Sequence, residues 1–337
     1  MRVYRELAAL RPAAFRSPAV TMGVFDGVHR GHRRLLAALH EAAARTGGEA
    51  VVLTFERHPR AVLGEDPPPS ITTLEHRLEL LCAAGVDAAV VLPFDRALAA
   101  MPAERFAREV LARRLGARAV VLGEDARFGH GRQGDLALLR RLAPELGFEV
   151  VAVPLLREGG AREGSGAAAQ PVSSSAVRAA IAAARLQEAE RLLGRPVTIT
   201  GRVVAGQGLG RRLGVPTANL QPLHELLLPH GVYAAQLALG GRLWPAMMSI
   251  GVRPTVAPPG APPTVEVHLI GFEGELYGQV LRVEVLARLR DEERFPSLQA
   301  LQQAMARDRE AALAVFARRR AGAAPGDRPA PASGPRA

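Results

Sequence analysis

The amino-acid sequence predicts an α/β domain with a parallel sheet, followed by a small antiparallel β-barrel domain that ends in a helix. In the first half, short apolar runs rich in β-branched residues alternate with helical periods, which is typical of a parallel sheet covered by helices on both faces. From residue 197 to 289, short β-type runs are separated by glycine and proline turns, which indicates a barrel. The length of 337 residues is sufficient for two domains with separate cores.

The first domain is expected to contain five strands alternating with four helices. The strand-like runs are Ala19–Phe25, Ala50–Phe55, Ala88–Leu92, Ala119–Leu122 and Glu149–Val153. The helical periods are Arg33–Arg45, Leu74–Ala84, Glu104–Leu115 and Asp135–Leu146. Ligands of such sheets bind at the carboxyl ends of the strands, near the point where the strand order reverses.

Loop and cap signals mark the junction of the two domains. The stretch Glu158–Gln170 is rich in glycine and alanine and is predicted as a loop. Ser173–Ser175 then opens an alanine-rich helix, and a shorter helix at Leu186–Leu193 ends at a Gly-Arg-Pro turn. The expected boundaries are therefore 1–185 for the first domain and 186–318 for the second, with 319–337 as a disordered tail.

The barrel domain is expected to hold five or six short strands and one final helix. The strand-like runs are Val197–Ala205, Gly231–Leu239, Leu243–Ile250, Thr264–Ile270 and Val280–Leu286, and the helix is expected at Ser297–Arg318.

Every one of the 43 basic side chains is an arginine, since the chain contains no lysine. This excludes the usual forms of P-loop NTPases, protein kinases and pyridoxal enzymes, each of which needs a lysine. The net charge of +10 is a weak argument for nucleic-acid binding, because no basic stripe with interleaved aromatic residues is present and aromatic residues make up only 4%. We therefore expect no nucleic-acid partner.

Several further features predict a soluble cytoplasmic protein without a membrane partner. No apolar run reaches the roughly 18 residues of a membrane span, and residues 1–10 have no signal-peptide core. The single cysteine, Cys82, excludes an internal disulfide and a cysteine-based metal cluster. Because Cys82 lies in a segment rich in alanine and leucine, we expect it to be buried in the core. Self-association is not indicated or excluded by the sequence.

The segment Gly23–His32, which reads Gly-Val-Phe-Asp-Gly-Val-His-Arg-Gly-His, follows a predicted strand. His29 and His32 are three residues apart, so we expect both on one face of the first helical turn, where free amides and the helix dipole attract anions. Gly31 between them would let a phosphate approach the backbone. This pattern suits a nucleoside triphosphate, with the imidazoles stabilising the charge of a departing pyrophosphate; the alternative is a pair of ordinary surface histidines.

The serines and the arginine of Ser173–Arg178 could form a second phosphate clamp from hydroxyls, helix amides and one guanidinium. Taken alone, a triple serine is usually only a helix cap. Thr54–Pro59 and Gly123–Gly129 follow the second and fourth predicted strands, where the ligand is expected, and their aromatic and proline residues could face a flat ring. Either segment could equally be an ordinary loop.

A second group of candidate residues lies in the barrel half. The glycine-rich run Gly206–Gly214 leads into Val-Pro-Thr-Ala-Asn, which contains Asn219, the sole asparagine of the chain. The Thr217 hydroxyl and the Asn219 carbonyl are oxygen ligands that suit Mg²⁺ on an ATP phosphate. Glu266 shares a strand face with Thr264 and His268, and its carboxylate could accept the proton of an attacking hydroxyl. The alternative is an exposed strand glutamate.

The ordered motifs resemble the bacterial bifunctional riboflavin kinase/FMN adenylyltransferase (FAD synthetase) family from about Ala19 to Asp308. His-x-Gly-His is a signature of the nucleotidylyltransferase superfamily. The matching segments are Gly23–His32, Thr54–Pro59, Gly123–Gly129, Ser174–Arg178, Leu192–Pro196, Gly210–Asn219, Gly231–Tyr233, Ile250–Thr255, Val265–His268 and Leu289–Phe295.

The resemblance implies that the first domain transfers AMP from ATP to FMN and that the barrel phosphorylates riboflavin with Mg-ATP. The implied partners are the small molecules riboflavin, FMN and ATP. The implied catalytic residues are His29, His32 and Glu266, and the implied Mg²⁺ ligands are Thr217 and Asn219. The implied ATP-binding residues are Gly23, Phe25, Asp26, Gly31, Asp125, Ser174, Ser175, Arg178, Gly208, Gly210, Arg211, Gly214 and Pro216. The implied flavin-binding residues are Phe55, Pro59, Arg127, Phe128, Arg290, Glu293 and Phe295.

The chain departs from the family pattern at a few positions. Val24 stands where many relatives have asparagine, Ala126 where an aromatic residue is common, Val215 where phenylalanine is frequent, and Ser175 where threonine is frequent. The Ala126 change could loosen the adenylyltransferase pocket. An alternative function is therefore a riboflavin kinase whose adenylyltransferase domain is weakened or inactive.

Overall fold

The computed structural model describes the whole chain except residues 8–9, 11–13, 159–168, 207–214, 252–262 and 323–337. The chain divides into two compact units. The first comprises Met1–Ser70 and Leu74–Ala176, and the second comprises Ile71–Thr73 and Val177–Ala337. The division falls inside helix α6 (Ser174–Ala182), so the 185/186 boundary expected from the sequence stays a prediction.

A six-stranded parallel sheet forms the centre of the first unit, in the order β1-β4-β3-β2-β5-β6. All five predicted strands are present, as β2 (Ala19–Met22), β3 (Ala50–Phe55), β4 (Ala88–Leu92), β5 (Ala119–Gly123) and β6 (Glu149–Val153). The edge strand β1 (Arg2–Tyr4) pairs in parallel with β4. The sequence does not indicate β1 because three residues are too few to show a period.

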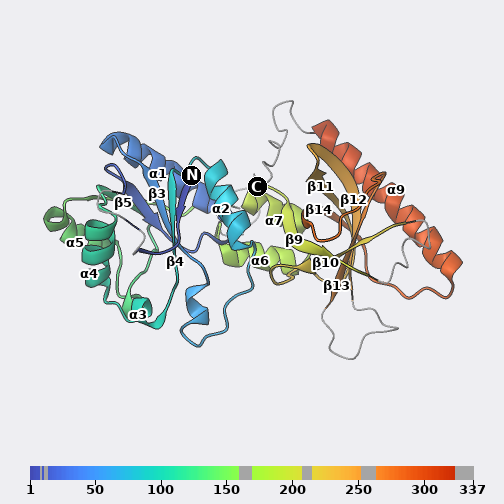
Figure 1. Cartoon of the computed structure of the whole chain (residues 1–337), viewed down its shortest axis with the longest axis horizontal. Helices are drawn as coiled ribbons and strands as arrows, with labels where there is room; N and C mark the ends of the chain where they lie inside the picture. The colour runs from blue at the N-terminus through green and yellow to red at the C-terminus, as the bar shows by residue number, and fades with distance from the viewer. Residues whose placement is uncertain (8–9, 11–13, 159–168, 207–214, 252–262, 323–337) are drawn as a thin grey trace. The chain divides into compact units, whose positions relative to one another are not determined.

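Helices cover both faces of this sheet, as the strand–helix alternation predicts (Figure 1). Alternate residues of each strand point to opposite faces. Val20, Val51 and Leu53 pack against the helices between residues 103 and 146, whereas Ala19, Ala50 and Val52 pack against α1 (Arg30–Thr46) and α2 (Leu74–Ala83). The central strands are buried on both faces, which explains why they read as continuous apolar runs.

The helices of the first unit differ in detail from the sequence pattern. The predicted helix 104–115 is a short α4 (Ala103–Phe106) that continues as a π-helical segment, η4 (Ala107–Arg114). The helix α5 (Leu136–Leu146) starts after Asp135, whose carboxylate accepts a hydrogen bond from the Leu138 amide. The remaining short elements are α3 (Arg96–Ala99) and the 3₁₀ turns η2 (Asp26–Val28), η3 (Pro59–Ala61) and η5 (His130–Arg132).

Short strands and two helices connect the sheet to the barrel. Most of the predicted loop 158–170 lies outside the described residues, but its two ends pair as β7 (Arg157–Glu158) and β8 (Gln170–Pro171). The Ser173 hydroxyl accepts a hydrogen bond from the Ala176 amide, so it caps α6 as expected. The helix α7 (Leu186–Leu193) has the predicted bounds, and Gly194 ends it in a left-handed conformation.

The second unit is a closed antiparallel barrel of six strands in the order β10-β13-β12-β11-β14-β9. Its strands are β9 (Val197–Val204), β10 (Ala218–Pro222), β11 (Gly231–Leu239), β12 (Arg242–Gly251), β13 (Thr264–Leu269) and β14 (Val280–Arg290). The sequence does not indicate β10, because alanine, asparagine, glutamine and proline are poor strand formers. Pairing with β9 and β13 makes this segment a strand and closes the barrel.

The C-terminal helix α9 (Leu298–Gly322) lies along β11, β12 and β14 (Figure 1). Ala312 of the helix packs against Ala234, Met247 and Ile270 of the barrel. The expectation of a disordered tail from residue 319 is wrong at its start, because α9 continues to Gly322. Arg319 explains the extension, since its guanidinium forms an ion pair with Glu190 of α7. Residues 323–337 lie outside the described part.

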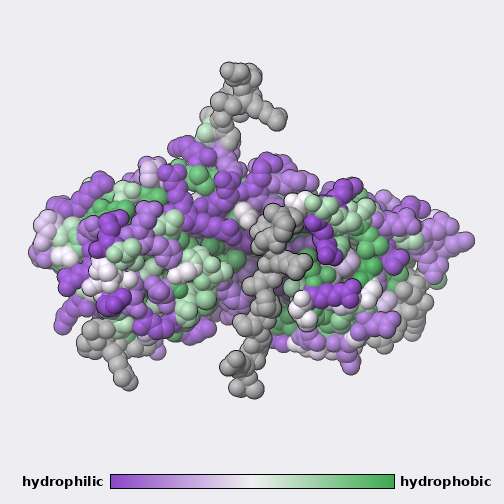
Figure 2. Space-filling view, turned by 90° about the horizontal axis from the view of Figure 1, so that it is seen from above, coloured by the Kyte–Doolittle hydropathy of each residue, from purple (hydrophilic) through white to green (hydrophobic). Residues whose placement is uncertain are grey.

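Within the described residues, no helix has the length and apolar character that crossing a membrane requires. The cytoplasmic location expected from the sequence stays a prediction. Figure 2 shows hydrophilic residues spread over the visible face of each unit, with apolar areas between them.

The prediction that Cys82 is buried is wrong, because its side chain is exposed. The helix α2 buries His76, Arg77, Leu78 and Leu81, and Cys82 lies next to this face rather than on it. Because alanine and leucine surround Cys82 in the sequence, composition alone does not indicate where the buried face of α2 ends.

We expect the Cys82 thiol to react with a disulfide reagent such as Ellman's reagent in the native protein, because its side chain is exposed. Replacing Cys82 with serine should change the free energy of unfolding by less than about 0.5 kcal/mol, as is usual for exposed positions. Thiol release measured with and without denaturant tests this. Reaction only after unfolding would show that the side chain is buried.

Candidate active sites

The strand order of the first unit places two of the predicted segments at the point where the order reverses. The neighbouring strands β2 and β5 pair in parallel, and the chain continues from β2 to β3 on one side, whereas β6 follows β5 on the other. Residues 23–32 follow β2, and residues 123–129 begin at the last residue of β5. The carboxyl ends of these strands form the edge at which such sheets bind nucleotides.

Between β2 and α1 the chain makes a turn with several left-handed residues. Phe25 has φ 53°, Gly27 has φ 78° and Val28 has φ 39°. Glycine adopts this conformation freely, but phenylalanine and a β-branched valine do so at a cost. Burial holds the turn in place, since Phe25 and Val28 are each about 1% exposed in the core beneath α1 and α2.

The turn delivers both histidines to the start of α1, as the sequence predicts. His29 is the N-cap residue of the helix, and its Nδ1 accepts a hydrogen bond from the His32 amide at 3.3 Å. The two imidazole rings stack with centroids 3.7 Å apart, and the Phe25 ring lies 5.0 Å from the His32 ring. Two imidazoles beside a helix N-terminus are suited to bind an anion.

The segment that precedes α6 passes close to Gly31, the residue between the two histidines in the motif, and limits the size of the side chain there. A side chain at Gly31 would place its Cβ 2.9 Å from the Val172 carbonyl oxygen and 3.1 Å from the His29 ring. The Ser174 hydroxyl donates a hydrogen bond of 3.0 Å to the Asp26 carbonyl. The start of α6 is therefore fastened to the β2–α1 turn. The Val172 backbone therefore occupies the space that a side chain at residue 31 would need, and the approach of a phosphate to Gly31 stays a prediction.

Other predicted residues of the first unit lie in different surroundings. Ser175 is exposed, and Gly23 is half-buried beside the Phe25 ring. Arg178 belongs to the second unit, so its contact with the triphosphate stays a prediction.

The strand-end segments after β3 and β5 contain both exposed and buried predicted residues. Phe55 packs edge-on against Phe94 with ring centroids 5.3 Å apart, and Pro59 begins a 3₁₀ turn. Asp125 and Arg127 are exposed. Phe128 is 9% exposed and belongs to the core on one face of the sheet. The roles implied for these residues stay predictions.

In the barrel, three predicted residues lie on neighbouring strands and on the segment that leads into them. Asn219 of β10 and Glu266 of β13 are directly opposite each other in the register. The Thr217 hydroxyl donates a hydrogen bond of 3.3 Å to Oε2 of Glu266. Thr264 and Glu266 are half-buried, while Val265 and Val267 are fully buried on the other face of β13, as the alternation predicts. The structure thus brings Thr217, Asn219 and Glu266 together.

A Cβ at Gly206 would collide with the Asn219 side-chain amide, so a larger residue there would displace that amide. The backbone of the glycine-rich run therefore starts in contact with the candidate metal ligand. The predicted residues Gly208, Gly210, Arg211 and Gly214 lie outside the described residues.

His268 is a residue whose role the sequence reasoning missed. Its Nδ1 lies 2.7 Å from the Pro216 carbonyl oxygen, so the ring donates a hydrogen bond that holds the backbone next to Thr217. The imidazole is 9% exposed. Burial lowers the pKa of His268 below its usual value, the hydrogen bond to Pro216 opposes this, and the positive charge of Arg309 lowers the pKa further. The available signal was its position two residues after Glu266, on the same strand face.

Two pockets meet at Pro216. One has a volume of about 520 Å³ and is lined by Thr217, Ala218, Val267 and the segment 272–277. The other, of about 550 Å³, is lined by His268 and by Gln302, Met305 and Arg309 of α9. Both volumes are in the range of small-molecule sites, and Pro216, Leu269, Phe272 and Glu273 line both pockets.

The predicted flavin residues after β14 have structural contacts of their own. Arg290 binds Asp308 of α9 with Nη2 to Oδ2 at 2.8 Å, and its guanidinium lies 5.3 Å from the centre of the Phe295 ring. Glu293 is exposed. None of Arg290, Glu293 and Phe295 lines either barrel pocket in the described structure, and their contact with flavin stays a prediction.

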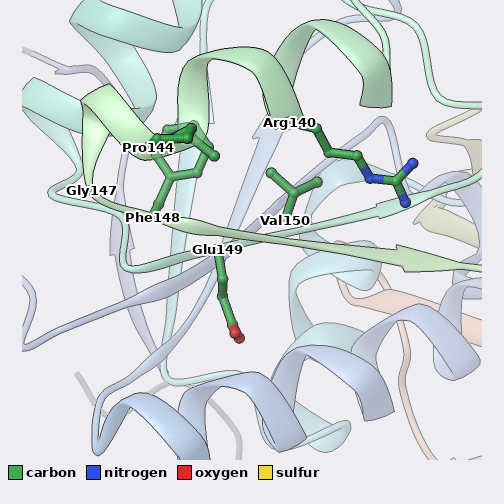
Figure 3. Close-up of a pocket in the computed structure, with 7 residues that line it drawn as sticks. Arg140, Pro144, Gly147, Phe148, Glu149 and Val150 are labelled. Atoms are coloured by element: carbon green, nitrogen blue, oxygen red, sulfur yellow. The ribbon is translucent and has the colours of Figure 1, made fainter.

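A third pocket, in the first unit, lies between α5 and the start of β6 (Figure 3). Pro144 and Phe148 form its apolar wall, and the Arg140 side chain extends from α5 beside it. Glu149, at the first position of β6, forms an ion pair with Arg45. The pocket is at the amino end of β6, opposite the edge that carries the histidines, so it has no part in that site.

Two family models match successive parts of the chain. The FAD synthetase model matches residues 12–166, and the riboflavin kinase model matches residues 193–316. These ranges fall on the α/β unit and on the barrel unit, respectively.

Curated relatives match almost the full length. The bifunctional riboflavin kinase/FMN adenylyltransferase of Escherichia coli strain K12 is 40% identical over 319 residues, which covers 94% of this chain and 98% of that protein. The protein of the same name from Pseudomonas fluorescens is 40% identical over 317 residues, with the same coverage. The Haemophilus influenzae protein is 37% identical over 301 residues, or 88% of this chain and 94% of that one.

A solved structure shares the fold over both units. The crystal structure described as a macrolide-efflux protein from Streptococcus pneumoniae superposes with a TM-score of 0.78 at 28% sequence identity. The match covers 92% of this chain and 98% of that chain. This likeness concerns the fold, whereas the family models and the curated relatives carry the information on activity.

The lowered pKa of His268 predicts a pH-dependent stability of the barrel. An unfolded histidine binds a proton near pH 6.5, but the folded state disfavours the proton because the ring is buried beside Arg309. Stability should be full above about pH 6.5 and fall as the pH decreases below it, by at most about 1.4 kcal/mol per pH unit. Trp244, the single tryptophan, lies on β12 and reports barrel unfolding by fluorescence.

The matched variant is His268→Asn, whose amide can donate to Pro216 but does not titrate. Its free energy of unfolding should lose less between pH 7.5 and pH 5.5 than that of the unsubstituted protein. Equal losses in the two proteins would remove His268 as the source of the pH dependence.

Proposed function

The chain belongs to the family of bifunctional riboflavin kinase/FMN adenylyltransferases, and from this membership we propose which residues perform each of its two reactions. The enzyme phosphorylates riboflavin with ATP to give FMN, and it transfers AMP from a second ATP to FMN to give FAD and pyrophosphate. The α/β unit carries the adenylyltransferase reaction, and the barrel carries the kinase reaction.

In the α/β unit, we assign the triphosphate of ATP to the start of α1. A phosphate oxygen of FMN attacks the α-phosphorus of ATP, and the bond from this phosphorus to the pyrophosphate oxygen breaks. His29 and His32, whose rings stack at the helix N-terminus, would stabilise the charge on the departing pyrophosphate. Ser174 supports the assignment because its contact with Asp26 brings the start of α6 to the same turn.

In the barrel, we assign the transfer of the γ-phosphoryl group to the surroundings of Glu266. The carboxylate would accept the proton of the riboflavin 5′-hydroxyl as the hydroxyl oxygen attacks the γ-phosphorus, and the bond from this phosphorus to the bridging oxygen breaks, so that ADP leaves. The hydrogen bond from Thr217 orients this carboxylate. The nucleotide would occupy the pocket that Thr217 lines, and the flavin the pocket along α9 that His268 lines.

Magnesium is the divalent ion that we propose for the kinase site. The side-chain oxygens of Thr217 and Asn219 are hard ligands that fit Mg²⁺, and both residues lie beside Glu266. Within the described residues no group of three or more His, Cys, Asp or Glu side chains is arranged to hold a metal, so the ion would be shared with ATP phosphates rather than fully enclosed by protein. When bound, Mg²⁺ would neutralise phosphate charge as the γ-phosphoryl group is transferred.

The observation that carries the proposal is the convergence of Thr217, Asn219 and Glu266 in one unit and of His29 and His32 in the other. Its first test is incubation of the protein with riboflavin, ATP and Mg²⁺, followed by separation of the flavins. We expect FMN to form first and FAD to follow. FMN without FAD would instead support a kinase with an inactive adenylyltransferase unit, as the departures at Val24 and Ala126 allow.

Paired substitutions test the separation of the two sites. His32→Ala should reduce FAD formation from FMN by about 100-fold or more, because an electrostatic contact to the leaving group is lost, and should leave FMN formation unchanged. Asn219→Ala should do the reverse and raise the Mg²⁺ concentration needed for kinase activity. Equal loss of both activities from either substitution would contradict the assignment of separate sites.

A further inference from the structure

Arg77 is a buried cation on α2 that no predicted motif includes. Its side chain is 6% exposed. One terminal nitrogen donates a hydrogen bond of 2.6 Å to the Val24 carbonyl, and the other donates one of 2.7 Å to the Phe55 carbonyl. Val24 lies in the turn that follows β2, and Phe55 is the last residue of β3. A single guanidinium thus ties together two neighbouring strand ends at the edge where the histidines lie.

The first of these acceptors belongs to the turn that leads to His29. The Val24 carbonyl also accepts a hydrogen bond of 3.1 Å from the Thr54 hydroxyl. Directly after it come the left-handed residues Phe25, Gly27 and Val28. A turn with unfavourable backbone angles persists only where surrounding contacts stabilise it. Arg77 supplies two such contacts, one to the Val24 carbonyl in the turn and one to the Phe55 carbonyl at the end of the neighbouring strand.

Arg77 also lies near carboxylates of the turn and of its own helix. Burial lowers the pKa of the guanidinium, while the carboxylates of Asp26 and Glu75 raise it. Asp26 is itself 6% exposed and lies in the turn, with its carbonyl bound to Ser174. Arg77 therefore compensates a buried negative charge next to the residues that we assign to the triphosphate. Removing the cation would leave Asp26 as a buried carboxylate without this partner charge.

We propose that Arg77 is a positioning residue for adenylyl transfer, which acts by holding the Val24 and Phe55 carbonyls and so fixing the turn that presents His29 and His32. This inference rests on the proposed assignment of that turn to ATP. Arg77 does not touch the reacting atoms; it sets the direction in which α1 starts and thus the place of the two imidazoles.

The test compares Arg77→Met, which removes both donors and the charge, with Arg77→Lys, which keeps a charge and three donors. For Arg77→Met we expect kcat of FAD formation from FMN to fall about 100-fold, as a misplacement of about 1 Å can produce. The KM for ATP should change by less than about three-fold, since the phosphate-binding groups remain. Arg77→Lys should recover most of the lost rate. Arg140→Met makes the same chemical change at an exposed position of α5 in the same unit and should have no effect.

Riboflavin kinase activity of the same polypeptide serves as an internal control and should be unchanged in all three variants. Histidine ring NMR signals supply a readout independent of catalysis. The signals of His29 and His32 should shift in Arg77→Met and return toward their original positions in Arg77→Lys, while those of the barrel residue His268 stay in place.

Unchanged FAD formation or unchanged His29 and His32 signals in Arg77→Met would overturn the proposal. Unfolding of the α/β unit in that variant, seen as loss of all its native histidine signals, would also overturn it, because Arg77 would then act on stability alone. If His32→Ala leaves FAD formation intact, the assignment of the site fails instead. The NMR comparison still decides whether Arg77 fixes the turn.

Discussion

The α/β unit depends on the backbone turn between the end of β2 at Met22 and the start of α1 at Arg30, because this turn presents the helix N-terminus. Phe25, Gly27 and Val28 adopt positive φ angles there. These conformations are maintained because the two apolar side chains are buried beneath α1 and α2 and because Arg77 and Thr54 bind the carbonyl that precedes them. The stacked histidines and the position of α6 follow from this turn, since Gly31 and Asp26 contact the segment 172–174.

In the barrel, strand pairing rather than a strained turn positions the candidate catalytic residues. Cross-strand pairing places Asn219 opposite Glu266 without any unusual backbone angle. The His268 ring holds Pro216, and the Thr217 hydroxyl then reaches the Glu266 carboxylate. Both units handle phosphate without lysine, a compact charge that many phosphate sites use. In this chain, helix amides, imidazoles and oxygen ligands on a metal ion take its place in the proposed mechanism.

Much of this arrangement was predictable because its signals are local. The buried strands of the sheet read as continuous apolar runs, and β13 reads as an alternation with Glu266 and His268 on one face. Elements whose identity depends on distant partners were not predictable. β1 and β10 become strands only through pairing with β4, β9 and β13, and α9 is prolonged beyond Arg318 by the contact of Arg319 with Glu190. Cys82 was misplaced because neighbouring composition does not fix a helix face.

By itself, the sequence determined the two-domain order, the position of the histidine motif after the first long strand, and the residue types able to hold phosphate and Mg²⁺. These depend on periodicity and on side-chain chemistry, which are properties of short segments. Only the tertiary structure decided which backbone lies next to Gly31, that Arg290 pairs with Asp308, and that Arg77 joins two strand ends. Such contacts join residues 18 or more positions apart, and the packing of the whole unit, rather than any local pattern, brings them together.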